Sequence, residues 1–349
     1  MLMVTVADLV FRARQFLIAV VGTGLVLAVA LVLSGLAAGF SVEVDQTVHG
    51  LGAQHFVLSK SSARRLTAFN AFPQSVATLV GSEPGVQRAD PFLLVPGQVE
   101  QSTSGADTVN IAGVRRGGLG DPVTVASGHP LDGPGQVVID NRLKLAPGST
   151  ISFGHHPLRV VGTVADRSLL GGVPVVYMGL ADAQQVAVGG RPLVTAVLVD
   201  GTVTTVPPGL EVASPDQVVA ATVSQLNSGV KSVRASQWML WVVAVIIVAA
   251  LLYVAALERR RDFAVLKALG SSSGALFGSL VLEAVMVTLL ASIVALVLSV
   301  FLSPLMAQPV DIPTLAYVAL PFIAVIIGAL ASLVALRRVT GADPAAAFS

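Results

Sequence analysis

The segment LERRRDFAVLKALG, residues 257–270, places six charged residues between two runs that are apolar enough to cross a bilayer. Hydrophobic residues make up 54% of the 349-residue chain and charged residues 12%. An average soluble domain has about 25% charged residues, so this composition is typical of a membrane protein. A short, charged, helix-prone segment between two such runs predicts a structured intracellular elbow on which a partner docks.

Four segments are long and apolar enough for a transmembrane helix, which needs about 20 apolar residues to cross a hydrocarbon core of about 30 Å. They are residues 16–40, 238–257, 275–303 and 312–336, with Pro304 just after the third. The first run is too long for the apolar part of a secretory signal, which has about 7–15 residues. The sequence therefore predicts a helical membrane protein with four transmembrane helices and an uncleaved first span.

Basic residues predict the orientation of the spans, because they are enriched on the cytoplasmic side. They occur in the N-terminal segment 1–15, in the elbow 258–274 and in the tail 337–349, whereas the link 304–311 has none. We therefore expect both termini and the elbow in the cytoplasm. Residues 41–237 are then extracytoplasmic.

This outer segment has short alternating or apolar runs separated by Gly and Pro, a pattern typical of β-strands. We expect strands at residues 55–58, 108–112, 136–140, 150–153, 158–164, 173–178 and 193–199, and helices at 73–80 and 180–188. A further helix is expected to begin after Ser214, with Pro215 in its first position, and to run through Val230 toward the second span. The predicted fold is thus an extracytoplasmic α+β domain inserted between transmembrane helices 1 and 2.

The elbow resembles the cytoplasmic elbow of the MacB/FtsX-type permeases of ABC transporters, the type VII or mechanotransmission family. The family pattern is a Glu-Arg pair, a short charged stretch and a Leu-(Lys/Arg)-Ala-Leu-Gly ending. The matching residues here are Glu258, Arg259, Asp262, Phe263, Leu266, Lys267, Ala268, Leu269 and Gly270. Glu283 at the start of the third span and Arg337-Arg338 and Asp343-Pro344-Ala345 in the tail also match, and the outer segment is similar in texture to the family's periplasmic domain.

The resemblance implies a permease subunit in a bacterial cell membrane (the inner or plasma membrane). It implies a homodimer that works with two copies of a separate ABC ATPase, and ATP and Mg are then bound by that partner and by no site in this chain. ATPase motion is expected to pass through the elbow and the spans to the outer domain. The expected output is export of an amphiphile or peptide, or control of an extracytoplasmic protein partner.

The chemistry of the elbow is compatible with docking. Phe263, Leu266 and Gly270 share one helical stripe, and a short amphipathic helix can press an apolar face into a groove of a partner. The arginines at 259–261 can pair with acidic groups of that partner or with anionic headgroups of membrane lipids. A basic topology anchor without a partner is the alternative reading of the same residues.

Several chemistries are disfavoured by the sequence. It contains no G-x-x-x-x-G-K-[ST] phosphate loop, and the segment before the first span is too short for a nucleotide domain, so we expect no enzymatic activity in this chain. There are no cysteines, and the net charge of +1 gives no basic field for nucleic acid. The five histidines follow no zinc spacing, and Gly270-Ser-Ser-Ser-Gly274, a formal match to the nucleophile-elbow motif, is expected to be a turn.

Three residues in or near the spans are candidates for packing or coupling. Glu283 is an acidic residue near membrane depth, where a charge is a functional candidate by default; we favour a structural role at the cytoplasmic interface. Gly35 and Gly39 form a small-xxx-small surface suited to close helix packing, including packing between two copies of the chain.

Two other classes of function remain open at this stage. The chain can be a membrane-anchored extracytoplasmic enzyme or receptor that is not coupled to ATP, which predicts activity in an isolated fragment 41–237. It can also be a secondary transporter, which favours broken helices, paired repeats and buried charges. Neither a catalytic constellation nor such repeats are evident in the sequence.

Overall fold

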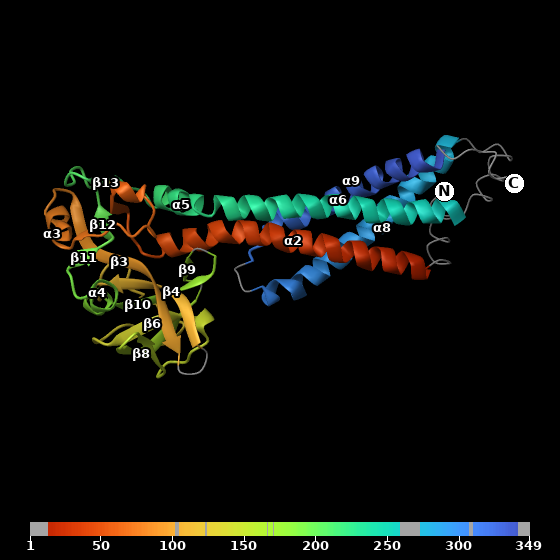
Figure 1. The fold of residues 1–349 in the computed structure, drawn as a ribbon. Helices are drawn as coiled ribbons and strands as arrows, with labels where there is room; N and C mark the ends of the chain where they lie inside the picture. The colour runs from red at the N-terminus through yellow and green to blue at the C-terminus, as the bar shows by residue number, and fades with distance from the viewer. Residues whose placement is uncertain are drawn as a thin grey trace. The chain divides into compact units, whose positions relative to one another are not determined.

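The computed structural model describes residues 13–101, 105–122, 124–165, 167–169, 171–258, 273–306 and 310–340. The chain divides into two compact units (Figure 1). One, here called the membrane unit, comprises Met1–Gly39 and Gly229–Ser349; the other, called the outer unit, is Phe40–Ser228.

The membrane unit contains the four predicted spans. They belong to the long helices α2 (Ala13–His49), α6 (Asn227–Glu258), α8 (Ser273–Leu302) and α9 (Thr314–Thr340), and each helix contains a stretch that is apolar and long enough to cross a membrane. A short 3-10 turn, Ser303–Leu305, follows α8 at the position where Pro304 predicted an end. All four helices extend beyond their expected spans. The largest differences are at α2, which continues past Phe40 to His49, and at α6, which begins at Asn227, before Trp238.

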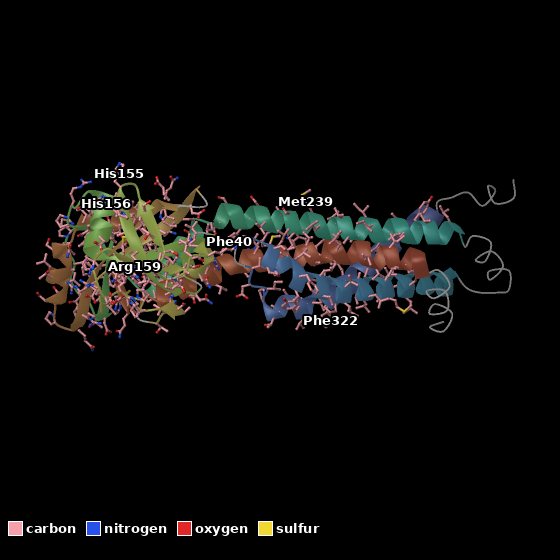
Figure 2. All side chains as sticks on the ribbon, turned by 90° about the horizontal axis from the view of Figure 1, so that it is seen from below. Phe40, His155, His156, Arg159, Met239 and Phe322 are labelled. Carbon is pink, nitrogen blue, oxygen red and sulfur yellow. The ribbon has the colours of Figure 1, made fainter. Side chains whose placement is uncertain are left out.

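Small residues let the helices of the membrane unit approach one another closely. A Cβ at Gly24 would lie 2.9 Å from Val294 of α8, and a Cβ at Gly328 of α9 would lie 2.8 Å from the Thr288 hydroxyl. Such contacts are the usual basis of helix packing in a bilayer, where burial from water contributes little. Large apolar side chains such as Met239 and Phe322 stay exposed on the outside of the unit (Figure 2), as expected for a surface that faces lipid.

The outer unit is built on a mixed sheet, which confirms the predicted α+β domain between the first two spans. Its main path runs β13-β1-β12-β3-β4-β10-β6-β8-β5, with β7 beside β3 and β8, β9 beside β10, and a separate β2-β11 pair. The strands are β1 (His55–Ser59), β2 (Phe72–Pro73), β3 (Val86–Gln101), β4 (Gly105–Val114), β5 (Ser127–Gly128), β6 (Gln136–Asp140), β7 (Thr150–Phe153), β8 (His156–Val164), β9 (Ser168–Leu169), β10 (Val173–Gly179), β11 (Leu193–Val194), β12 (Ala196–Gly201) and β13 (Leu210–Ala213). The helices are α3 (Ser75–Gly81), α4 (Leu180–Val188) and α5 (Pro215–Ser224), with 3-10 turns at Lys60–Ser62 and Asn141–Leu143.

Strand β3, the longest in the sheet, was not expected from the sequence because Pro91, Pro96 and Gly97 interrupt its pattern. The strand changes partner along its length: residues up to Phe92 pair with β12, and residues from Leu93 pair with β4 on the other side. Phe92 O accepts from Thr195 N, the residue just before β12, so even-numbered positions of β3 direct their backbone groups toward the β12 side. The ring nitrogen of Pro91, which carries no hydrogen, therefore faces the β4 side of β3, at a position beyond the end of β4. A proline is tolerated there because no ladder hydrogen bond is lost.

The helix predicted from Ser214 begins as expected and ends earlier. The Ser214 hydroxyl oxygen accepts a hydrogen bond from Gln217 N, and the Gln217 side chain accepts one from Ser214 N, a complete capping box with Pro215 in the first turn. However, α5 ends at Ser224 and α6 begins at Asn227, so one helix does not run through Val230. The run expected as a single strand at 193–199 is likewise divided at Thr195, whose N–H and hydroxyl are bonded to β3.

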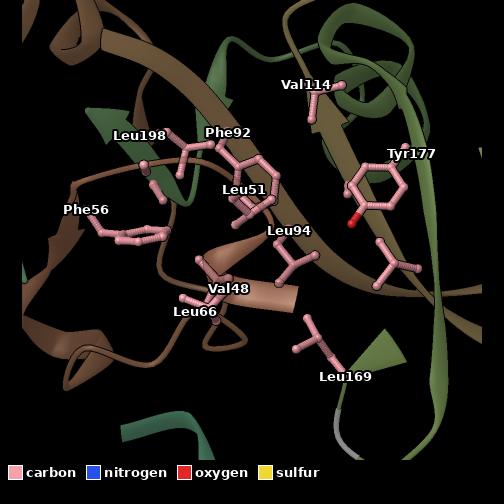
Figure 3. Close-up of a cluster of buried hydrophobic side chains, with 14 of the residues drawn as sticks. Val48, Leu51, Phe56, Leu66, Phe92, Leu94, Val114, Leu169, Tyr177 and Leu198 are labelled. Atoms are coloured by element: carbon pink, nitrogen blue, oxygen red, sulfur yellow. The ribbon is translucent and has the colours of Figure 1, made fainter. Parts of the chain in front are cut away.

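The main core of the outer unit gathers side chains from the sheet and from the end of α2. Figure 3 shows Val48 and Leu51 lying among Phe56, Phe92 and Leu94, all almost fully buried. Tyr177 of β10 is buried in the same cluster at 3% exposure. Burial raises the pKa of Tyr177 to about 12, an effect that the nearby Arg167 opposes and Asp140 reinforces.

The raised pKa of Tyr177 makes the free energy of unfolding of the outer unit fall at alkaline pH. Its phenol ionises near pH 10 in the unfolded chain and near pH 12 in the folded one, so its contribution is fully present below pH 10 and is lost as the pH rises toward 12. The loss amounts to at most about 2–3 kcal/mol. We expect Tyr177→Phe to flatten this pH dependence in thermal unfolding of the full chain between pH 9 and pH 11.5, followed by near-UV circular dichroism. An unchanged slope would contradict the assignment.

Candidate functional site

The structure describes the helices on either side of the predicted ATPase-coupling elbow. Helix α6 ends at Glu258, and α8 begins at Ser273. Most residues of the elbow lie outside the described residues: Arg259, Asp262, Phe263, Leu266, Lys267, Leu269 and Gly270. The turn expected at Gly270-Ser271-Ser272 lies outside them as well.

Glu283 lies inside the membrane unit. It is the third residue of the apolar stretch Val281–Leu305 and is 2% exposed. Its neighbour Ala284 packs against α9, where a Cβ at Gly328 would lie 3.0 Å from the Ala284 carbonyl oxygen. The carboxyl group is therefore held at the packed side of α8, close to the end of the span that adjoins the elbow.

Gly35 and Gly39 are both buried in α2. A Cβ at Gly35 would overlap the Ile312 side chain and would lie 2.8 Å from Val310. The Gly35 carbonyl oxygen also accepts a hydrogen bond from Asp311 N at 3.1 Å. At Gly35, the small-residue surface is thus occupied by the same chain, at the link between α8 and α9, and is not left free for a second copy.

The outer end of α2, residues 40–49, is packed into the core of the outer unit. With 37 residues, α2 is about 55 Å long, which exceeds a hydrocarbon core of about 30 Å. Val44 and Val48 in this extension are fully buried in the main core. Burying two such side chains contributes roughly 1.5–3 kcal/mol each, so residues 40–49 are an integral part of the outer unit.

A buried carboxylate fixes this extension to the chain just before β10. Glu43 is 5% exposed, and its two oxygens accept hydrogen bonds from Gly171 N at 3.1 Å and Gly172 N at 2.8 Å. Both glycines have positive φ, +87° and +89°, a conformation that other residues rarely adopt. The backbone can present two successive N–H groups to one carboxylate here because both positions are glycine.

Further hydrogen bonds join the same helix end to β9 and to Arg167, which is in turn bonded to β6. The Thr47 hydroxyl donates to Ser168 O at 2.8 Å, and the Arg167 guanidinium donates to Gln46 O at 2.8 Å. Asp140, at the end of β6, accepts from Arg167 N at 2.7 Å. A side chain at Gly50 would overlap the Arg167 guanidinium. We call Glu43, Gln46, Thr47, Asp140, Arg167, Ser168, Gly171 and Gly172 the α2 anchor.

The sequence reading missed the α2 anchor because it ended the first helix at Phe40. A weak signal was present, since Glu43 and Thr47 are four residues apart and lie on one helical face if the helix continues. Their partners come from residues more than 100 positions away, which periodicity cannot reveal.

The histidines of the outer unit have separate surroundings. His49 lies 3.2 Å from Asp45 and 3.5 Å from Asp216, and His55 Nδ1 lies 2.8 Å from Gly201 O. His155 and His156 are exposed at the surface (Figure 2). Within the part of the chain that the structure describes, no three His, Cys, Asp or Glu side chains lie together as a metal site.

Comparison with known proteins covers the whole chain. Residues 237–344 match the family model of the FtsX-like permease C-terminal region. An uncharacterized ABC transporter permease of Mycobacterium bovis is 37% identical over 348 residues, which cover 100% of this chain and 99% of the relative. An ABC transporter permease of Mycobacterium tuberculosis is 35% identical with the same coverage.

Two solved structures are similar to the outer part of the chain at low sequence identity. The periplasmic region of MacB from Actinobacillus actinomycetemcomitans has a TM-score of 0.35 and 16% identity, covering 53% of this chain and 97% of that one. The extracellular domain of the ABC-type transporter YknZ from Gram-positive bacteria has a TM-score of 0.32 and 14% identity, covering 50% and 92%.

The α2 anchor can be tested by removing one acceptor. Glu43→Gln replaces a carboxylate oxygen by an N–H₂ group that cannot accept from Gly171 or Gly172, and losing a buried hydrogen bond to a charged acceptor costs about 1.5–3 kcal/mol. We expect the amides of Gly171 and Gly172 to exchange with solvent roughly ten- to a hundredfold faster. Hydrogen exchange with mass spectrometry measures this. Glu83→Gln, at a glutamate whose side chain accepts from the hydroxyl of the exposed Thr204, is the control, and equal exchange in both variants would contradict the anchor.

Proposed function

Because the chain belongs to the FtsX-like ABC transporter permeases, we propose that it transmits the motion of a separate ATPase across the membrane to its own outer unit. The observation that carries this proposal is α2, a single helix that contains the first span and ends inside the core of the outer unit. A stiff element of this kind suits mechanical transmission better than it suits a polar path for a solute.

The ATPase is a different polypeptide in this proposal. The sequence has no phosphate-loop motif, and that motif supplies the backbone N–H groups and the lysine that hold nucleotide phosphates. ATP and Mg²⁺ are therefore bound by the partner. Two copies of the permease work with two copies of the ATPase, whose closure on ATP supplies the motion.

The elbow receives that motion on the cytoplasmic side. Phe263 and Leu266 enter a groove of the ATPase, and Glu258, Arg259, Asp262 and Lys267 pair with charges around it. Leu269 and Gly270 belong to the same elbow, predicted at residues 258–274. The buried Glu283 follows shortly after, at the end of α8 that adjoins the elbow, where it can couple the two.

The α2 anchor delivers the motion to the outer unit. Residues 40–49 are packed into the main core and hydrogen-bonded to β9, to Arg167 and to the residues before β10. Arg167 is in turn bonded to β6. Their displacement strains these hydrogen bonds or carries the bonded strands along. The output is a change in what the outer unit binds, used to expel an amphiphile or peptide or to control an extracytoplasmic protein.

The elbow is tested by replacing Phe263, Leu266 and Lys267 together with alanine. Removing apolar anchors from the centre of an interface weakens binding strongly, so we expect the ABC ATPase recovered with the chain from native membranes to fall roughly tenfold or more. Membrane insertion stays intact because the spans are unchanged. Detergent extraction, capture of the chain and mass spectrometry give the readout.

A matched variant in the outer unit, Lys60→Ala with Leu79→Ala, should retain the ATPase. Equal ATPase recovery from the elbow variant and from this control would sink the elbow assignment. Recovery of no ATPase with the wild-type chain in several detergents would favour a membrane-anchored enzyme or receptor instead.

A further inference from the structure

Strand β3 leaves part of one edge open in the middle of the outer sheet. On that edge β12 pairs only as far as Phe92, and β7 meets β3 at the single pair Glu100 and Ser152. Among the described residues, no strand is paired with this edge of β3 between these two points, although β11 contacts β3. An unpaired edge is a template for another strand.

The register decides which backbone groups face the open edge. Leu94 N donates to Thr195 Oγ1 on that side, and Glu100 pairs there with Ser152. Even-numbered residues of this part of β3 therefore direct their backbone groups away from β4. Pro96 presents a carbonyl without an N–H, and Gln98 presents both groups; these two residues are exposed.

A cleft of about 550 Å³ opens at the same place. Its floor and walls are apolar and include Val95, Ile111, Phe153 and Val186, with Phe69 at 53% exposure among the lining residues. A Cβ at Gly97 would lie 2.6 Å from the Ile111 side chain, so glycine at this position keeps the floor open. No lining residue carries a charge.

We propose that this cleft binds an uncharged, extended segment of an extracytoplasmic protein, which adds to β3 as a strand and places an apolar side chain between Phe69 and Phe153. The backbone of such a segment supplies an N–H for the Pro96 carbonyl and a carbonyl and an N–H for Gln98. Its side chains alternate in direction, so every second one enters the apolar floor.

The chemistry of the cleft distinguishes this ligand from other apolar molecules. An alkyl chain fills apolar space but satisfies neither the Pro96 carbonyl nor the Gln98 N–H, and leaving such groups unpaired is unfavourable. A charged ligand finds no opposite charge among the lining residues. This inference names a ligand for the outer unit. It rests on the proposed function only in one respect, that ATPase motion changes the binding of this ligand.

The test uses the full chain in nanodiscs of neutral lipid, without ATPase or nucleotide, so that its failure leaves ATPase coupling untouched. The probe is a fluorescent, acetylated and amidated octapeptide of alternating threonine and valine. We expect saturable binding by fluorescence anisotropy. Two further peptides carry N-methyl groups at alternate residues, one at the odd and one at the even positions. Each keeps all its side chains and loses the N–H groups along one of its two edges. The peptide methylated along the edge that pairs with β3 should bind roughly tenfold more weakly.

Two pairs of variants place the binding on this edge. Gln98→Pro removes the N–H that faces the cleft, while Gln98→Ala removes only the side chain and is its control. Phe69→Ala removes the exposed aromatic wall, and Leu79→Ala, at a leucine of 60% exposure on α3, is its control. We expect Gln98→Pro and Phe69→Ala each to weaken binding roughly tenfold, and the controls to bind like the wild type.

The methylated peptides are measured on the wild-type chain, so the test stands even if a variant does not fold. Equal binding of all the methylated and unmethylated peptides overturns strand addition. Equal binding by Gln98→Pro and Gln98→Ala overturns the assignment to this edge. Absence of saturable binding up to about 1 mM peptide, a free energy weaker than about 4 kcal/mol, overturns the proposal as a whole.

Discussion

The burial of the last turns of α2 in the core of the outer unit is the constraint on which the rest of the arrangement depends. Val44 and Val48 are fully buried there, and Glu43 accepts two backbone hydrogen bonds from Gly171 and Gly172. A carboxylate is costly to bury unless its oxygens are satisfied, so the two glycines and the glutamate require one another. Residues 40–49 consequently behave as part of the sheet domain and not as a loose tether.

Two structural devices allow the outer unit to combine a rigid core with an open binding edge. The first is the change of partner along β3, which pairs with β12 before Leu93 and with β4 after it. The second is the placement of Pro91 and Pro96, whose missing N–H groups face the sides where the strand has no ladder neighbour. A proline inside a ladder removes a hydrogen bond. Pro91 and Pro96 therefore lie where the edge of β3 that each ring nitrogen faces has no paired strand.

Much of the fold could be predicted from the sequence, because the strongest signals are local. Spans of about 20 apolar residues are visible without any tertiary information. Strands β6 and β7 and the start of α5 at Pro215 were found at their observed positions, where alternation, Gly and Pro punctuation and a capping box coincide. The family resemblance carried by the elbow is confirmed by comparison with known permeases.

The remainder depended on contacts between distant residues. Strand β3 reads as interrupted because its prolines are tolerated only through its change of partner. The extension of α2 past Phe40 is stabilised by a core that the sequence does not display, and Glu43 finds its partners more than 100 residues away. The elbow residues stay a prediction, since nearly all of them lie outside the described part of the chain.

The most direct test of transmission measures hydrogen exchange at Ser168, Gly171 and Gly172 in the full chain bound to its captured ATPase, with and without ATP. The account predicts that ATP changes the exchange of these amides in the wild type. It predicts no change in the variant that lacks Phe263, Leu266 and Lys267. An exchange pattern that is indifferent to ATP, or that responds equally in the elbow variant, would contradict the claim that motion passes from the elbow to the α2 anchor.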